Sequence, residues 1–212
     1  MRRLGVCALM MSLCLLAACG GGRGGEDADQ LALDLRGRYL ALSGCTARLE
    51  LTADYGERVY EYGLDLSYQR EGDTTLTVTA PEGAAGVTAR ISGDETFLEY
   101  DGASLETGPL DESGLSPMGA VMLMFRCARE GFIAESGMEE VGEGDALLRF
   151  TCRDPEAGAG EGTEVTLWAS PETYALVRGE VSVDGARVVG CTFEDMAMEM
   201  EGTEQDTWTE HE

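Results

Sequence analysis

Hydrophobic and polar residues alternate with a period of two along most of the chain after residue 45. Leu49, Leu51 and Ala53 alternate with polar residues, and Leu64 and Leu66 do the same in the next segment. Successive side chains of a strand point to opposite faces, so this alternation is typical of antiparallel strands with one buried and one solvated face. It predicts about ten strands, over residues 46–53, 60–69, 76–80, 87–91, 96–100, 103–107, 146–152, 165–169, 174–183 and 189–193.

Short polar turns separate these segments. Asp101-Gly102 and Asp184-Gly185 are two-residue hairpin signals, because a type I′ turn needs positive φ at both central positions. Gly179 falls inside the strand expected over 174–183 and predicts a β-bulge there. The acidic, glycine-containing segment Glu135–Asp145 is predicted as a loop between two meanders.

A helical period precedes the first strand. Asp29 is a suitable N-cap for a helix from Gln30 to Ser43, which Gly44 would end. One stripe of that helix is apolar and predicts a face packed on the sheet; it consists of Leu31, Leu35, Tyr39 and Leu42.

A second helix is predicted in the middle of the chain. Ser116 is its N-cap, Pro117 its first helical residue and Gly131 its end. Residues 120–125 are apolar without a polar side, so this helix either fills the core or faces an apolar cavity. Both interpretations stay open, since methionines suit a filled core as well as a surface that adapts to apolar ligands.

The start of the chain has the layout of a signal peptide. Arg2 and Arg3 precede an apolar run from Leu4 to Leu16, which is too short to span a bilayer. The small pair at 17–18 followed by Cys19 resembles the lipobox of bacterial lipoproteins. The resemblance implies removal of residues 1–18, a lipid such as palmitate on Cys19, and attachment to the outer side of the membrane; the alternative is an ordinary secretory signal. Residues 19–30 are predicted to be a flexible linker, and the acidic tail 199–212 is predicted to be disordered.

The charge balance and the residue types argue against several classes of function. The net charge is −25, the 15 basic residues include no lysine, and His211 is the sole histidine. Such a chain is repelled by phosphates, so we expect no nucleic-acid partner. Histidine, the usual general base near neutral pH, is missing from the body of the domain. No hydrolase, metalloprotease or calcium-loop motif occurs in the sequence. We therefore expect no catalytic residues, no metal and no cofactor.

Four cysteines lie in the body of the domain, at Cys45, Cys127, Cys152 and Cys191. No two are spaced C-x-x-C, which argues against a zinc knuckle or a thioredoxin-like motif. Four cysteines allow three disulfide connectivities, and buried free thiols are the alternative. The pairing stays open at this point.

The order of these elements resembles the LolA/LolB-like lipoprotein-carrier superfamily over roughly residues 30–198. The segments that carry the resemblance are Leu64–Tyr68, Thr75–Glu82 and Thr96–Gly102, within a chain that starts with a lipobox. It is closest to LolA-like lipoproteins of the Gram-positive germination type. The resemblance implies an α+β fold, mainly antiparallel: a curled incomplete barrel with helices across its concave face.

Two functions follow from the resemblance. The first is a membrane-anchored module that holds an acyl chain or another apolar ligand in the half-barrel. Its predicted ligand-binding residues are Met118, Val121, Met122, Met124 and Phe125 on the helix and Tyr60, Tyr62 and Leu64 on the sheet. The alternative is a non-catalytic scaffold with a filled core that binds an envelope or sporulation protein, or a second copy of itself.

Overall fold

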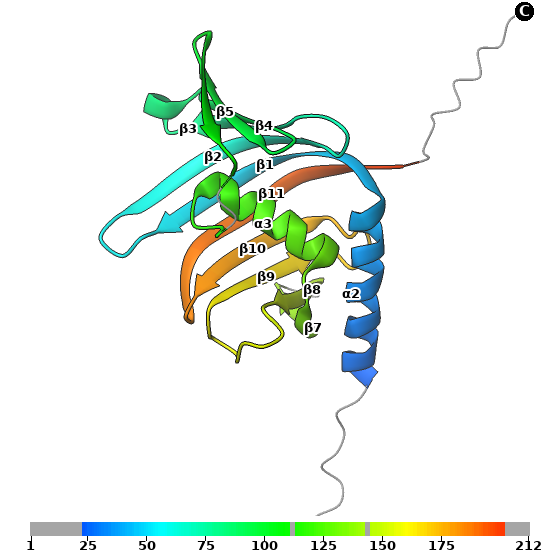
Figure 1. Cartoon of the computed structure of the whole chain (residues 1–212). Helices are drawn as coiled ribbons and strands as arrows, with labels where there is room; N and C mark the ends of the chain where they lie inside the picture. The colour runs from blue at the N-terminus through cyan, green and yellow to red at the C-terminus, as the bar shows by residue number, and fades with distance from the viewer. Residues whose placement is uncertain (1–22, 111–112, 143–144, 202–212) are drawn as a thin grey trace, which may run out of the picture.

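Eleven antiparallel strands form one curled, open sheet in this computed structural model, which describes residues 23–110, 113–142 and 145–201 (Figure 1). The strand order is β6-β5-β4-β3-β2-β1-β11-β10-β9-β8-β7, so two meanders meet where β1 pairs with β11. The predicted incomplete barrel is confirmed. The strands are β1 (Leu42–Asp54), β2 (Val59–Gln69), β3 (Thr74–Ala80), β4 (Thr88–Ser92), β5 (Glu95–Tyr100), β6 (Ala103–Gly108), β7 (Ile133–Val141), β8 (Asp145–Cys152), β9 (Thr163–Ala169), β10 (Leu176–Val183) and β11 (Ala186–Met200).

The alternation of the sequence becomes the two faces of this sheet. Along β1 the buried residues include Leu49, Leu51 and Ala53, and the residues between them are exposed. Leu49 lies opposite Leu64 on β2, so apolar rows continue from strand to strand on the concave face. Both predicted hairpins are confirmed, because residues 101–102 and 184–185 all adopt positive φ and connect paired strands.

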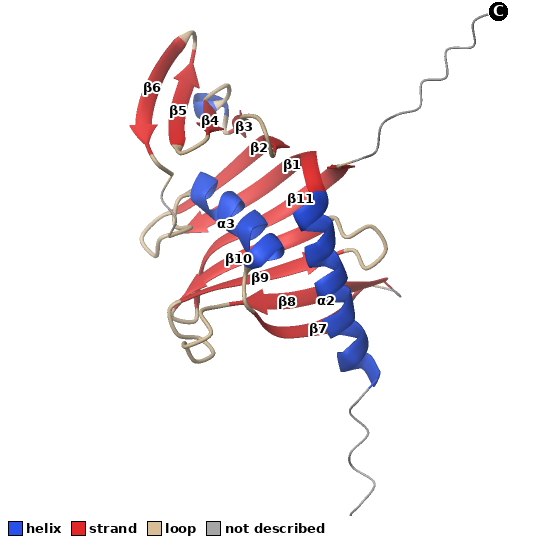
Figure 2. Cartoon of the chain, turned by 45° about the vertical axis from the view of Figure 1, so that its right-hand side comes forward, coloured by secondary structure: helices blue, strands red, loops and turns tan. Residues whose placement is uncertain are grey.

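Two helices of the described chain lie on the concave face (Figure 2). The first, α2 (Arg23–Ala41), packs on β7 and β8, and the second, α3 (Pro117–Glu130), crosses β9, β10 and β11. A short 3-10 helix, η1 (Glu82–Ala84), follows β3. In Figure 2 strands β3–β6 extend beyond the helices, and we call these four strands the wing.

The boundaries of α2 differ from the prediction. The helix begins at Arg23 instead of Gln30 and ends at Ala41, and Leu42 already belongs to β1. Residues 23–30 are therefore helical where a flexible linker was expected. Ala28 is fully buried, and this packing of a small residue extends the helix beyond its large apolar stripe. Cys19 and the rest of residues 1–22 lie outside the described residues.

The ends of α3 agree with the prediction. The Ser116 hydroxyl caps the helix by accepting a hydrogen bond from the Gly119 N–H at 3.0 Å, and Pro117 is the first helical residue. At the other end the Gly131 N–H donates to the Cys127 carbonyl. The Arg36 guanidinium of α2 also donates to the Gly131 carbonyl and ties the two helices together.

Three predicted features of the second meander are wrong. Glu135–Asp145 is mostly a strand, because β7 lies at the sheet edge and gains its backbone hydrogen bonds from β8 whatever its side chains are. Gly179 lies in regular register, and the irregularities of β10 fall on either side of it. The last strand runs on to Met200, through a bulge at Asp195 (φ 50°) that the sequence pattern did not indicate. Residues 202–212 of the tail lie outside the described residues.

Candidate functional site

A cleft of about 700 Å³ opens between α3 and the β1–β5 half of the concave face. Its lining comes from the C-terminal end of α2, the adjoining ends of β1 and β2, the turn between β4 and β5, residues 109–110 and one side of α3. Pockets that bind small molecules have volumes of roughly 300–1,000 Å³, so this cleft is large enough for a ligand.

The cleft exists because the helices cover the two halves of the sheet unequally. Both helices pack on β7–β11, and α3 reaches only the border of the other half (Figure 2). Val121 and Met124 of α3 are fully buried towards the sheet, while Met122 and Leu123 remain half-buried and line the cleft. The concave face is thus filled on one side of α3 and open on the other.

An aromatic cluster forms the deep wall of the cleft. The Phe125 ring is centred 5.5 Å from the ring of Tyr68 and 6.0 Å from the ring of Tyr39, and all three residues line the cleft. Phe193 closes the cluster from β11, with its ring centre 6.3 Å from that of Phe125. Burial raises the pKa of the Tyr39 hydroxyl well above its usual range, so this wall is uncharged at neutral pH.

The rest of the lining combines apolar and charged groups. Leu42 and Ile91 add aliphatic surface, whereas Arg126 and Arg129 bring two guanidinium groups from one side of α3. Asp94 and Thr96 contribute from the β4–β5 turn and the start of β5. An apolar pocket with a few polar groups at defined positions is the usual form of a small-molecule site.

Two of the five predicted ligand-binding residues on α3 line the cleft, namely Met122 and Phe125. Val121 and Met124 are fully buried instead, and Met118 is half-buried against the core. A helix that is apolar all round does not reveal which side packs on the sheet, so the sequence could not separate these positions.

The three predicted sheet residues do not line the cleft. Leu64 is buried opposite Leu49, and Tyr60 and Tyr62 stack with ring centres 6.5 Å apart near the β1–β2 turn. The tyrosine that does line the cleft is Tyr68, at the other end of the same strand. Tyr68 shares the strand and the face of the predicted residues, but the cleft lies at the opposite end of β2.

Sequence reasoning also missed the polar residues of the lining. Arg126 and Arg129 are three residues apart, so they project from the same side of a helix, which was a signal that the sequence contained. Thr96 carried no signal, because its place in the lining depends on where β5 lies relative to α3.

The four cysteines are free thiols, and all are buried. Cys127 at the end of α3 and Cys152 at the end of β8 face each other, and the Cys152 thiol lies 3.6 Å from the Cys127 carbonyl oxygen. The hydrogen bond between the two thiols raises the pKa of Cys127 and lowers that of Cys152. Burial raises the pKa of Cys45 and of Cys191 to about 12.

The strand register separates the other cysteines. Cys191 lies opposite Leu51 and Cys45 lies opposite Met198, so these two thiols are six residues apart along the β1–β11 ladder, or about 20 Å. Cys152 on β8 is three strands away from Cys191 on β11, about 14 Å along the sheet. A disulfide needs Cα atoms within about 7 Å, so the strand positions exclude a Cys45–Cys191 or a Cys152–Cys191 bond. Cys127 and Cys152 are the two thiols that lie in contact.

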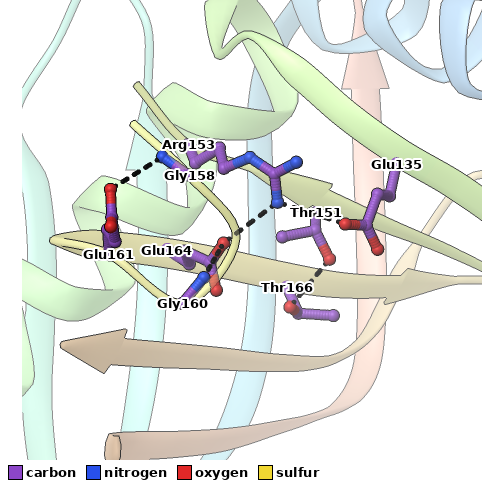
Figure 3. A network of polar contacts seen from close by, with 8 residues as sticks. All are labelled: Glu135, Thr151, Arg153, Gly158, Gly160, Glu161, Glu164 and Thr166. Carbon is purple, nitrogen blue, oxygen red and sulfur yellow. Dashed lines mark hydrogen bonds and ion pairs between the residues drawn. The ribbon is translucent and has the colours of Figure 1, made fainter. Parts of the chain in front are cut away.

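A polar network on the convex face of β7–β9 lies outside the cleft (Figure 3). The Arg153 guanidinium donates to carboxylates of Glu135 and Glu164, both at 3.1 Å, and the Gly160 N–H donates to the same Glu164 oxygen. Arg153 follows Cys152, whose side chain is buried on the concave face, so the network faces the other way. Its contacts hold the loop after β8 against the sheet, which is a structural role.

Within residues 23–110, 113–142 and 145–201, no group of three or more His, Cys, Asp or Glu side chains is placed to hold a metal ion. None of the helices in this part of the chain is both long enough and apolar enough to cross a membrane.

No family model matches the sequence, and no curated protein matches it either. Among solved structures, the fold is shared with an uncharacterized conserved protein of Thermus thermophilus, at 9% identity and a TM-score of 0.50, over 82% of this chain and 88% of that one. The chain is also similar to the lipoprotein LppX of Mycobacterium tuberculosis, at 16% identity and a TM-score of 0.45, over 80% and 92% of the two chains. A LolA superfamily protein of Nitrosomonas europaea is 10% identical, with a TM-score of 0.42 over 81% and 93%.

Proposed function

We propose that this chain is a non-catalytic, extracytoplasmic lipoprotein whose domain binds an acyl chain or a similar apolar ligand in the cleft beside α3. The observation that carries this proposal is the half-filled concave face. Two helices cover β7–β11, while aromatic and aliphatic side chains line a cleft of about 700 Å³ on the other side of α3.

The chemistry of the lining supports a long apolar ligand. Apolar side chains from both the sheet and the helix converge on the cleft, and Met122 offers a flexible thioether that adapts to different shapes. A ligand that covers these groups removes apolar surface from water, at about 25 cal/mol per Å².

Ligand extraction and probe binding test the proposal. The full chain carrying Cys19→Ser is purified without detergent, extracted with organic solvent, and the extract is examined for lipid by mass spectrometry. The extracted protein is then titrated with the neutral probe N-phenyl-1-naphthylamine, whose fluorescence rises in apolar surroundings. We expect lipid in the extract and saturable probe binding afterwards.

Two tryptophan substitutions give a matched comparison. Met122→Trp places a large ring in the cleft, whereas Met138→Trp changes an exposed methionine on β7. We expect the first variant to weaken probe binding about tenfold or more and the second to bind as the parent does. The proposal is wrong if no lipid is recovered and both variants match the parent.

The lipid anchor is tested separately. The arrangement of the apolar run, the small pair and Cys19 supports acylation of that cysteine. Cells that express the parent or the Cys19→Ser variant are fed labelled palmitate and fractionated. We expect label and membrane attachment in the parent alone, and equal attachment of both forms would rule out the anchor.

Partner binding is a second candidate function, favoured by the edge of the wing. β6 ends the sheet, and two large side chains near it are mostly exposed, Leu105 at 65% and Tyr100 at 57%. An exposed strand edge can accept a strand from another chain. A stable complex or homodimer that a Leu105→Lys substitution abolishes, with no extractable lipid, would favour this function over the first.

A further inference from the structure

The apolar cleft carries concentrated positive charge on an otherwise acidic chain. The sequence has 15 basic and 40 acidic residues, yet two arginines three positions apart, Arg126 and Arg129, line the same cleft. Both are half-buried. The Arg129 guanidinium lies 3.7 Å from a carboxylate oxygen of its neighbour Glu130, whose side chain is 56% exposed. An exposed ion pair of this length is weak, so the Arg129 guanidinium can still donate hydrogen bonds to an anionic ligand.

A buried hydroxyl in the same lining lacks a hydrogen-bond partner. Thr96 is 2% exposed, and its Oγ1 makes no hydrogen bond among the described residues. Buried hydroxyls are normally paired, and each exception needs an explanation. Because Thr96 lines the cleft, an oxygen of a bound molecule is a suitable partner for it.

The charges are also distributed unevenly around the cleft. Asp94 lies on the turn between β4 and β5, and its carboxylate repels an anion at that rim. The two guanidinium groups both come from α3. The field across the cleft therefore directs a negative group away from the Asp94 carboxylate and towards the two guanidinium groups, within the part of the cleft that Thr96 also lines. The aromatic wall around Phe125 is left to an apolar chain.

From this arrangement we infer that the ligand is an anionic amphiphile, with a carboxylate or phosphate head group bound by Arg126 and Arg129 and an acyl chain packed against Phe125. This inference rests on the proposed function and names the class of lipid. Guanidinium groups bind carboxylate and phosphate through charge-assisted hydrogen bonds, which are roughly twice as strong as neutral ones.

Displacement of the neutral probe by matched lipids tests the head-group preference. The full chain carrying Cys19→Ser is loaded with N-phenyl-1-naphthylamine and titrated with palmitate, hexadecan-1-ol or 1-palmitoyl lysophosphatidic acid. We expect both anionic lipids to displace the probe at about tenfold lower concentration than the alcohol. The order of the two anionic lipids tells whether a carboxylate or a phosphate is the better head group.

Paired arginine substitutions assign the preference to α3. Arg126→Gln with Arg129→Gln removes both guanidinium groups from the cleft. Arg48→Gln with Arg187→Gln removes the same charge from exposed positions, whose side chains are 63% and 58% exposed. We expect the first pair to abolish the preference while hexadecan-1-ol binds as before, and the second pair to retain it.

Thr96→Val gives an independent check of the hydroxyl. The replacement keeps the shape of the side chain and removes an unpaired polar group, so the melting temperature should not fall. We expect palmitate binding to weaken about threefold. If palmitate binds as tightly as before, Thr96 has no part in binding the ligand.

Two results would overturn the inference alone, and a third would overturn the proposed function together with it. Equal displacement by palmitate and hexadecan-1-ol leaves an apolar site without head-group selection. Equal loss of preference in both arginine pairs means that overall charge, and not the cleft, attracts the anion. Absence of any probe binding removes the lipid-binding function itself, and the head-group inference with it.

Discussion

Replacement of Gly179 by alanine tests how closely α3 packs on the sheet. A Cβ added at Gly179 would lie 3.0 Å from the Met124 Cε and 3.2 Å from the Leu167 Cδ2, and it would be closer still to the Met124 sulfur. Real Cβ atoms essentially never approach other atoms more closely than about 3.0 Å, so the neighbours must move. Met124 is fully buried, so the end of its side chain can only shift within the packed core.

The expected cost follows from two opposing terms. Overpacking a well-filled core costs typically about 1–3 kcal/mol. Alanine in place of glycine stabilises the folded state by about 0.5–1 kcal/mol, because the unfolded chain then has less conformational freedom to lose. The central values of the two terms leave a loss of about 1 kcal/mol in the free energy of unfolding for Gly179→Ala.

Gly137 on β7 provides a matched control. A Cβ added there meets nothing within 4 Å, and its φ is not positive. We expect Gly137→Ala to raise the free energy of unfolding by a few tenths of a kcal/mol, up to about 1 kcal/mol. Urea titration followed by the fluorescence of buried Trp168 and by circular dichroism measures both variants.

A double-mutant cycle identifies the contact. Met124→Ala alone should cost about 2–5 kcal/mol because it leaves a cavity. In the double variant the new methyl at position 179 occupies part of that cavity. The stability loss of the double variant should therefore be smaller than the sum of the two single losses, by about 1 kcal/mol or more. Additive costs, or a Gly179→Ala variant as stable as the parent, would show that α3 does not pack on β10 at this point.

Three further predictions concern the thiols and the convex face. Because burial raises the pKa of Cys191 from 9.0 to about 12, its contribution to stability is complete below pH 9 and is lost between pH 9 and 12. Urea titrations over that range should show that the free energy of unfolding falls less steeply with pH in Cys191→Ala than in the parent, by the equivalent of one proton. An unchanged slope would contradict the burial of this thiol. Oxidised glutathione should join Cys127 to Cys152 and leave the other two thiols reduced. Closing this loop of 25 residues should raise the free energy of unfolding by about 3.5 kcal/mol. A Cys45–Cys191 or Cys152–Cys191 bond in peptide mass spectrometry would refute the strand register. Arg153→Met should lower the free energy of unfolding measured by urea titration by about 1–2 kcal/mol, because Glu164, whose side chain is 16% exposed, loses its charged partner. An unchanged free energy of unfolding would mean that the network does not stabilise the loop after β8.

Local signals predicted most of the elements correctly. The strands around Leu49 and Leu64 follow from alternation, and the turns at Asp101-Gly102 and Asp184-Gly185 follow from their need for positive φ. The two ends of α3 follow from Ser116, Pro117 and Gly131 in the same way. Each of these features depends on residues only a few positions apart, so the sequence alone contains the relevant information.

The elements that were missed depend on distant neighbours. β7 has acidic residues on both faces and no apolar alternation, and it is a strand because β8 offers it a backbone partner. The first turns of α2 are helical although their composition is that of a linker, since Ala28 packs in the core. Pairing and burial of this kind outweigh weak local propensity.

The same division applies to the candidate site. The amino-acid sequence by itself determined the alternating faces of the strands, the two hairpins and an apolar α3, because backbone periodicity and turn geometry are local properties. Only the tertiary structure decided that Met122 and Phe125 face a cleft while Met124 packs on Gly179, and that Cys127 meets Cys152. These outcomes depend on strand register and on how α3 crosses the sheet, which arise from contacts between residues far apart in the chain.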